Sequence, residues 1–515
     1  MSLGLGGEGF GRALLAASKE LPNGMTLLGA LEHTRNNGPW EISQGLRRTN
    51  GIVTLSSGTL AQGMSVSLMG FDSRWRATDQ VPQRLLDAGT LNRFGTVDSS
   101  DAGSTSRYSL STQWRGGNAL GPWRVSAYAM RYQLQLYSNF TYALNRPVDG
   151  DQILQEDARK VFGLNAQQTV FHTLAGLPAR TQFGLQVRHD RITVGLFDTV
   201  QRTVQATTRR DRVRETAAAF FADTQVTWTP WLRTVAGVRA DRMMAAVVSQ
   251  NQALNSGQSH GGQISPKFTA VLGPWAQTEF FVNAGRGFHS NDARGTTQTI
   301  DPATSAPVDK TKVFESSRGA EIGVRSELIE GVQSSLALWR LHSQSELVFA
   351  GDSGTTEASR PSKRQGIEWN TRWTATKWLL LDADFAWSRA RFSDENPAGN
   401  AVPNAVNQVA SLGATIKNLG PWSANLQGRY IGSAALIEDN SVRSKPSFLT
   451  SLRVARQFGS QVEMTLDVFN LFNRKVNDIE YYYASQLKTE IAPVLDKHVH
   501  PAQPRTLRIG LAVKL

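Results

Sequence analysis

Apolar and polar residues alternate with a period of two along most of this chain. The alternation is clearest in residues 220–228, 367–373, 462–469 and 505–515. In the last segment, Leu507, Ile509 and Leu511 alternate with small or charged residues up to Leu515. Successive strand residues face opposite sides, so each segment predicts a strand with one apolar and one polar face. Helical periodicity nowhere persists for three turns.

The connections between these strands alternate in length. Short turns are predicted near residues 18–24, 57–62, 115–122, 173–179, 229–231, 273–275, 327–331, 375–378, 419–422 and 458–461. Longer polar loops are predicted near residues 35–44, 76–103, 139–154, 192–210, 248–262, 287–315, 351–364, 393–407, 432–446 and 474–504. Several short turns are followed by a tryptophan: Trp123, Trp231, Trp275, Trp378 and Trp422. Such a girdle is typical of a membrane–water interface.

Together these patterns predict an all-β fold, a transmembrane antiparallel β-barrel. Short turns at one end, long loops at the other, and strands with one apolar face are typical of such barrels. Closure also removes the sheet edges that lipid does not tolerate. The alternative is a large soluble β protein such as a propeller. A propeller shows a sequence repeat of about 40–50 residues, and this chain has none.

The number of connections predicts the number of strands. Ten short turns join twenty strands and the terminal segment adds one, so about 21 strands are visible. Bacterial single-chain barrels have an even number of strands, so we expect a 22-strand barrel whose first strand precedes Met1. Residues 1–515 are then a single barrel domain, because strand pattern begins near Phe10 and leaves no separate plug segment.

The composition excludes several kinds of site and partner. Cysteine is absent, which excludes thiol catalysis, thiolate metal sites and disulfides. No uncharged apolar stretch reaches about 18 residues, so no transmembrane helix is expected, and the N-terminus lacks a signal-peptide pattern. The net charge is +12, but the arginines are scattered through the alternating segments. Nucleic acid is therefore not expected as a partner, and anionic ligands or anionic lipid fit better.

The C-terminal region resembles the TonB-dependent outer-membrane receptor family. The resemblance rests on LDVFNLFN at 466–473, the following RKVNDIEYYY, and PRTLRIGLAVKL at 504–515. NAGRGFH at 283–289 also resembles a mid-barrel strand of that family. The family's usual last residue is phenylalanine, so Leu515 departs from the pattern.

The resemblance implies TonB-energised uptake of a scarce ligand across the bacterial outer membrane. Its expected partners are the TonB–ExbB–ExbD complex, outer-membrane lipid and lipopolysaccharide, and a small ligand, with a monomeric receptor and no cofactor. The family's plug, TonB box and signal peptide are not visible, so we expect a fragment. The cargo stays open between a siderophore, a cobalamin, a saccharide and a metal chelate. The rival functions are a plugless porin-like diffusion channel and an adhesive or structural barrel.

One loop start gathers residues suited to a polar ligand. His289, Asn291, Asp292 and Arg294 follow Gly287-Phe288 and can bind by charge-assisted hydrogen bonds. The alternative is that they structure the loop, because Asn and Asp bond nearby backbone in turns.

Other candidates are weaker. His498 and His500 face one side of an extended segment and form a possible metal pair, although solvated loop histidines are the simpler interpretation. Asp352 in GDSG lacks the Gly-x-Ser-x-Gly frame of a serine hydrolase, so no enzyme is predicted. Several charged residues are expected to face inward and to line a ligand path or a hydrated wall: Arg239, Glu368, Arg372, Asp382, Asp384 and Arg453. A basic excess on that wall would favour anionic cargo.

Overall fold

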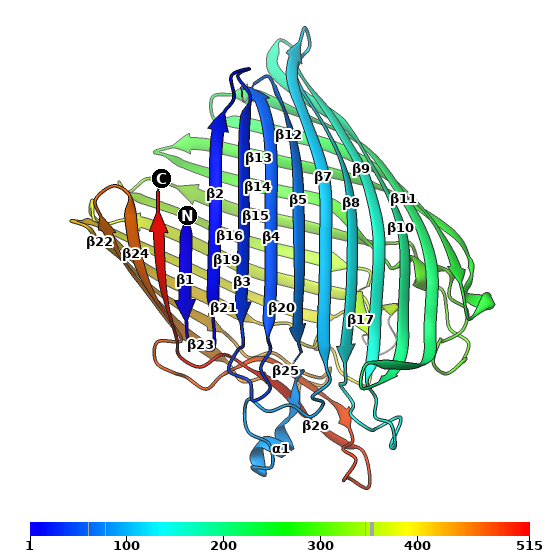
Figure 1. The fold of residues 1–515 in the computed structure, drawn as a ribbon. Coiled ribbons are helices and arrows are strands. Elements are labelled where there is room, and N and C mark those ends of the chain that lie inside the picture. The colour runs from blue at the N-terminus through cyan, green and yellow to red at the C-terminus, as the bar shows by residue number, and fades with distance from the viewer. Residues whose placement is uncertain (60, 78, 346, 351–354, 515) are drawn as a thin grey trace.

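The computed structural model describes residues 1–514 except 60, 78, 346 and 351–354. Most of them form one closed antiparallel sheet of 22 strands (Figure 1). Each strand pairs with the next barrel strand along the chain, as the register of β2 with β3 and of β3 with β4 illustrates. The predicted 22-strand transmembrane-type barrel is therefore confirmed. Within the described residues, no helix is both long and apolar enough to cross a membrane.

The barrel strands follow one another in chain order. They are β1 (Ser2–Gly6), β2 (Gly11–Glu20), β3 (Thr26–Asn36), β4 (Leu46–Gly58), β5 (Gly63–Arg76), β7 (Ala102–Asn118), β8 (Gly121–Ser138), β9 (Ile153–Leu174), β10 (Leu177–Val200), β11 (Thr203–Thr229) and β12 (Leu232–Ser249). The second half comprises β13 (Gly257–Trp275), β14 (Thr278–Ser290), β15 (Phe314–Ser326), β16 (Val332–Ser343), β19 (Ser362–Thr374), β20 (Leu379–Phe392), β21 (Gln408–Leu419), β22 (Trp422–Ile431), β23 (Ser447–Phe458), β24 (Val462–Phe469) and β27 (Thr506–Val513).

Closure depends on the pairing of β1 with β27. Leu3 lies opposite Leu511 and Leu5 opposite Ile509, and the Met1 amine donates to the Val513 carbonyl at 2.8 Å. The last alternating segment thus pairs with the first strand, as a closed barrel requires. The count of 21 visible strands was one short, because β1 supplies the strand expected before Met1. Its five residues, SLGLG, are too short and too rich in glycine to show a clear alternation.

The two faces of the sheet differ in polarity. One face is apolar and exposed. Its directly opposed residues on β4, β5, β7, β8 and β9 are Val53, Leu68, Leu110, Ala129 and Phe162, and the four large side chains among them are exposed. The other face carries polar contacts such as Thr54 Oγ1 to Ser67 Oγ at 2.8 Å. The apolar face of such a barrel is the outward one, so the register assigns every strand residue to an outward or inward face.

The predicted alternation of connections holds with one exception. Residues 192–210 were expected to form a loop, but β10 and β11 continue through them to a turn at Gln201 and Arg202. The misleading signal was the run of polar residues there, which extends the hairpin beyond the apolar belt. Four turn tryptophans, Trp231, Trp275, Trp378 and Trp422, are exposed, and Trp231 stacks on Trp275 with ring centroids 6.0 Å apart. Asp352 and Leu515 lie outside the described residues.

The long loops carry the remaining elements. These are β6 (Val81–Pro82), α1 (Gln83–Asp87), η1 (Ala253–Asn255), α2 (Ala293–Thr297), β17 (Leu347–Ala350), β18 (Thr355–Ala358), β25 (Asn477–Ser485) and β26 (Val494–Pro501). All of them lie at the same end of the barrel, because each interrupts a connection of the long kind. We call this end the mouth.

The assignment of faces predicts the effect of a charge at two neighbouring positions. Leu68→Arg puts a cation on the outward apolar face and is expected to cost about 2–4 kcal/mol. Ser111→Arg, on the inward face opposite Ser67, should cost far less. Urea unfolding in lipid vesicles, followed by tryptophan fluorescence, measures both. Equal destabilisation by the two substitutions would contradict the assignment.

Candidate ligand-binding site at the barrel mouth

The loop between β14 and β15, residues 291–313, contains three of the four predicted ligand residues. Asn291 closes its base: its backbone N–H donates to the Val313 carbonyl at 3.0 Å, and its Nδ2 donates to the Lys312 carbonyl at 2.7 Å. Asn291 is almost fully buried. The side-chain amide therefore holds the two ends of the loop together.

Asp292 and Arg294 organise the short helix α2. Asp292 caps its N-terminus, with Oδ1 accepting from the Arg294 N–H at 2.9 Å, and it binds the Arg294 guanidinium at 2.7 Å. Arg294 is only 6% exposed. Burial opposes ionisation of Asp292, but the charge and hydrogen bonds of Arg294 outweigh it and lower the pKa of Asp292. Both groups therefore stay charged at neutral pH.

The α2 loop packs inside the barrel. Ala293 is fully buried against Ile192, Val213, Ala245 and Val247. The register places these side chains on the face opposite the exposed Phe220 and Met244, which is the inward face. The loop therefore lies against the inner wall of β10–β12 at the mouth.

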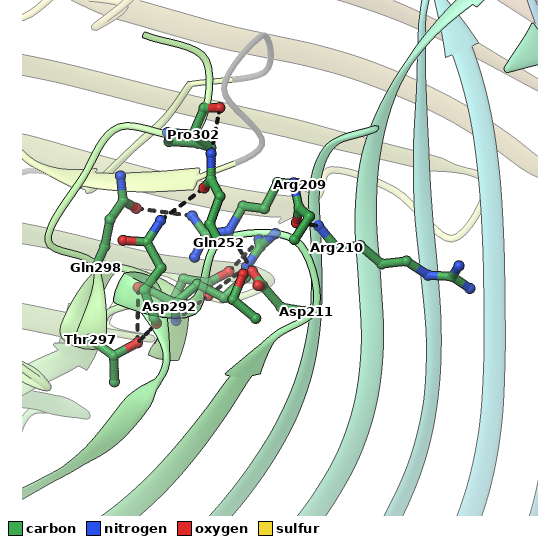
Figure 2. A network of polar contacts seen from close by, with 12 residues as sticks. Arg209, Arg210, Asp211, Gln252, Asp292, Thr297, Gln298 and Pro302 are labelled. Carbon is green, nitrogen blue, oxygen red and sulfur yellow. Dashed lines mark hydrogen bonds and ion pairs between the residues drawn. The ribbon is translucent and has the colours of Figure 1, made fainter. Parts of the chain in front are cut away.

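A second set of contacts, which sequence reasoning missed, ties this loop to the wall (Figure 2). Arg209 and Asp211 on β11 are fully buried and form an ion pair. Arg209 Nη1 also donates to Gln298 Oε1, just after α2, at 2.9 Å. Asn255 Oδ1 accepts from the backbone N–H groups of Thr299 and Ile300 at 2.9 and 3.1 Å. Strand β11 and the β12–β13 connection thus fix the loop from two sides.

The Arg209–Asp211 pair belongs to a ladder on the inward face. Four adjacent strands each carry an arginine and an aspartate two residues apart that form an ion pair: Asp157–Arg159, Arg188–Asp190, Arg209–Asp211 and Arg239–Asp241. Residues two apart on a strand share a face. The sequence signal was an arginine and an aspartate two residues apart in each of four segments, and the pairing of β9 to β12 places these four ion pairs on neighbouring strands.

His289 has a different environment from its three neighbours. It lies on the inward face of β14, at the end of the strand near the mouth, directly opposite Glu315. Its Nε2 is buried without a hydrogen-bond partner among the described residues. The structure thus brings the four predicted residues to one loop base. It engages Asn291 Nδ2, Asp292 and Arg294 in internal contacts, and it leaves His289 Nε2 and Asn291 Oδ1 without hydrogen-bond partners among the described residues.

Two other loops join across the mouth. Strand β6, from the β5–β7 connection, pairs with β26 from the β24–β27 connection. Arg84 on α1 reinforces this contact. Its guanidinium binds Glu490 at 2.7 Å, and its backbone N–H and Nη1 donate to Asp496 Oδ2 at 2.8 and 3.3 Å. We call β6, β25 and β26 the loop sheet. It links segments about 400 residues apart in sequence.

His498 and His500 lie in the loop sheet, in separate aromatic contacts. The His498 ring stacks on Tyr483 with centroids 3.7 Å apart, while His500 packs on Trp40. Both nitrogens of His498 have partners, the Asp496 carbonyl at 3.1 Å and Ser485 Oγ at 2.8 Å. The described residues contain no group of three metal-ligating side chains. The expectation of solvated histidines was wrong for His498, which is fully buried because loops distant in sequence cover it.

The residues expected on the inner wall face inward by the register. Arg239 pairs with Asp241 at 2.8 Å, and Arg453 Nη2 donates to Asp467 at 3.0 Å. Arg372 lies opposite Asp382, and both line a hollow of about 680 Å³ near the short turns. Asp384 lines the same hollow, and Glu368 lies opposite Ala386. This wall is rich in carboxylate partners for its cations.

Comparison with protein families identifies the barrel. A family model described as "TonB dependent receptor-like, beta-barrel" matches residues 39–471, from the loop before β4 to just beyond β24. This chain belongs to that family. The family is one of transport receptors of the bacterial outer membrane, not of enzymes.

Solved structures share the fold of this TonB-dependent receptor barrel. Unliganded ferric citrate transporter FecA aligns with a TM-score of 0.78 and 15% identity over 100% of this chain and 78% of FecA. The siderophore receptor PiuA from Acinetobacter baumannii gives 0.80 and 12% over 100% and 81%. The copper transporter OprC gives 0.76 and 15% over 100% and 79%. At such identities the likeness shows the fold alone. A comparison with curated protein sequences gave no match.

The α2 network predicts a strong effect of removing one charge. Asp292→Asn keeps a capping oxygen but leaves the buried Arg294 cation unpaired, which should cost about 3–5 kcal/mol of local stability. Hydrogen exchange of residues 291–300 measures the loss of protection. Asp309→Asn, an exposed residue of the same loop, is the control. Adding Arg294→Gln to Asp292→Asn should restore part of the protection. Unchanged exchange in the single variant would contradict the structural role.

The loop sheet should weaken in acid. Burial, reinforced by Arg84 and opposed by Asp496, lowers the pKa of His498 to about 4, below the ordinary value of about 6.5. The unfolded loop then binds the proton more readily, so stability is complete above about pH 6.5 and falls toward pH 4, by at most about 1.4 kcal/mol per pH unit.

Hydrogen-exchange protection factors of residues 477–501 at pH 7 and pH 5 test this dependence. His498→Gln should remove it, while His33→Gln, an exposed histidine on β3, should not. A loop sheet equally protected at both pH values would show that His498 does not govern it.

Proposed function

We propose that this protein is an outer-membrane receptor that imports a small, scarce ligand with energy from the TonB–ExbB–ExbD complex. Membership of the TonB-dependent receptor family carries the proposal. The mouth supports it, because its loops are tied together and to the inner wall by α2 and by the loop sheet. A passive pore needs no such ordered mouth, whereas a receptor gains affinity from pre-organised loops.

The cargo we propose is a metal chelate. The proteins that share this fold include transporters or receptors for ferric citrate, ferric catecholate, ferric yersiniabactin and copper. The inner wall gives no reason to restrict the chelate to anions, because its arginines are matched by aspartates in the ladder of β9–β12. The cargo's charge is then recognised at the mouth and not by the wall as a whole.

For ligand contact we propose the base of the α2 loop. His289 offers a ring nitrogen with no partner among the described residues and is the first residue to test. Asn291, Asp292 and Arg294 act with it by holding the loop, since Asn291 Nδ2, the Asp292 carboxylate and the Arg294 guanidinium already bond within it. A chelate bound here would lie between the inner wall and the loop sheet.

Uptake assays in the native host test the function. Cells with and without the gene, and cells lacking TonB, are given radiolabelled ferric chelates, cobalamin and an oligosaccharide. We expect saturable accumulation of a metal chelate that requires both the receptor and TonB. Non-saturable entry that survives loss of TonB would instead support the diffusion channel.

The proposed contact has its own test. His289→Ala should lower the apparent affinity for the imported chelate about tenfold, the loss of one or two polar contacts. His172→Ala, an exposed residue near a short turn, should leave that affinity unchanged. Equal affinity in both variants would move the binding site away from the α2 loop without affecting the assignment of function.

A further inference from the structure

Four basic residues stand directly opposite one another on the outward face of β8–β11. Arg131 pairs with Lys160, Lys160 with Arg191, and Arg191 with Arg214. We call these four residues the cationic row. It crosses three strand spacings, roughly 15 Å. Directly opposed like charges destabilise a sheet, so a bound anion would stabilise the row.

Within the described residues, no acidic side chain pairs with the cationic row. All four side chains are exposed, and none of them forms an ion pair in the described chain. Ion pairs between described barrel-strand residues lie on the inward face, for example Arg12–Glu32, Lys267–Asp223 and Arg453–Asp467. By the register, the described outward face of the barrel strands carries only two acidic residues, Asp72 on β5 and Glu156 on β9. Glu156 lies four residues beyond Lys160, toward the mouth.

The position of the row indicates the kind of partner. The next row toward the short turns contains Phe162, opposite His189, and beyond it lie the exposed Leu164, Leu185 and Phe220. The cations therefore border the apolar belt on the side of the mouth. A groove of about 670 Å³ runs along them, lined also by Arg212 and Thr193.

We propose that the cationic row binds the phosphate groups of lipopolysaccharide in the outer leaflet. Arginine forms strong bidentate bonds with phosphate, and several cations in line match a headgroup that carries more than one phosphate. The acyl chains of the same lipid would lie along Phe162, Leu164 and Phe220. The inference rests on the outer-membrane location proposed above and is independent of the cargo.

A second observation supports a collar that continues around the barrel. Arg35, Arg47 and Arg74 are directly opposed on β3–β5, and Arg286 lies opposite Arg318 on β14 and β15. These residues also face outward and have no ion-pair partner in the described chain.

The test uses the full-length receptor purified in mild detergent and titrated with bisphosphorylated lipid A, followed by native mass spectrometry. Replacing all four cations of the row with glutamine should lower the apparent affinity at least tenfold. The matched control replaces four inward cations that have no ion pair in the described chain: Arg107, Arg124, Lys417 and Arg429. It should change the affinity less than twofold. Equal affinity in the row variant and the parent would overturn the proposal.

Further measurements identify the ligand and exclude misfolding. Removing one lipid A phosphate should weaken binding to the parent, while inorganic phosphate should not compete at millimolar concentration. Phosphatidylglycerol bound as tightly as lipid A would overturn the assignment to lipopolysaccharide. Without lipid, the row variant should melt no lower than the parent, since repulsion is removed. Added lipid A should raise the melting temperature of the parent alone, and a receptor that reaches the outer membrane but lacks this response would refute this inference only.

Discussion

The structure depends on one requirement: every backbone N–H and C=O group inside a bilayer must be bonded within the protein. A sheet meets it only when its first and last strands pair. Here β1 and β27 do so, in a register that places Leu3 and Leu5 beside Leu511 and Ile509. Closure fixes two faces for every strand, and the polarity of the remaining side chains follows from those faces.

The distribution of charge is the clearest consequence. Carboxylates of the strands lie almost entirely inward, where they neutralise arginines such as Arg188 and Arg239. An ion pair on the outward face would face lipid or its headgroups, where an acidic side chain meets other anions. Unpaired cations are tolerated there at the level of the headgroups. Basic residues on the outward face therefore do not indicate the charge of the cargo.

The loops of the mouth are held in place by side-chain contacts and by the loop sheet. Its loops would be costly to order for binding if each were free. Two devices reduce that cost. The buried Arg209–Asp211 pair and Ala293 fix the α2 loop to the inner wall, and the pairing of β6 with β26 links the β5–β7 loop to the β24–β27 loop. A ligand entering between them meets an arrangement that is already formed.

The sequence by itself determined the fold class, because a period of two, with short turns and long loops in alternation, is local information. It also located nearly all strands and turns, and the inward side of Arg239 and Arg453. It missed β1, whose glycines hide the alternation, and it broke the β10–β11 hairpin, where polar residues extend the strands beyond the membrane. The sequence did not predict the contacts between loops. Asn291, Asp292 and Arg294 stood out as polar residues, but only the tertiary structure decided that they bond to one another and to the loop base. His498 is buried because Tyr483 on the adjacent strand and Pro82 on β6, about 400 residues away in sequence, both cover it. The cationic row likewise arises from strand register, since Arg131, Lys160, Arg191 and Arg214 are far apart in sequence and become neighbours only through backbone pairing.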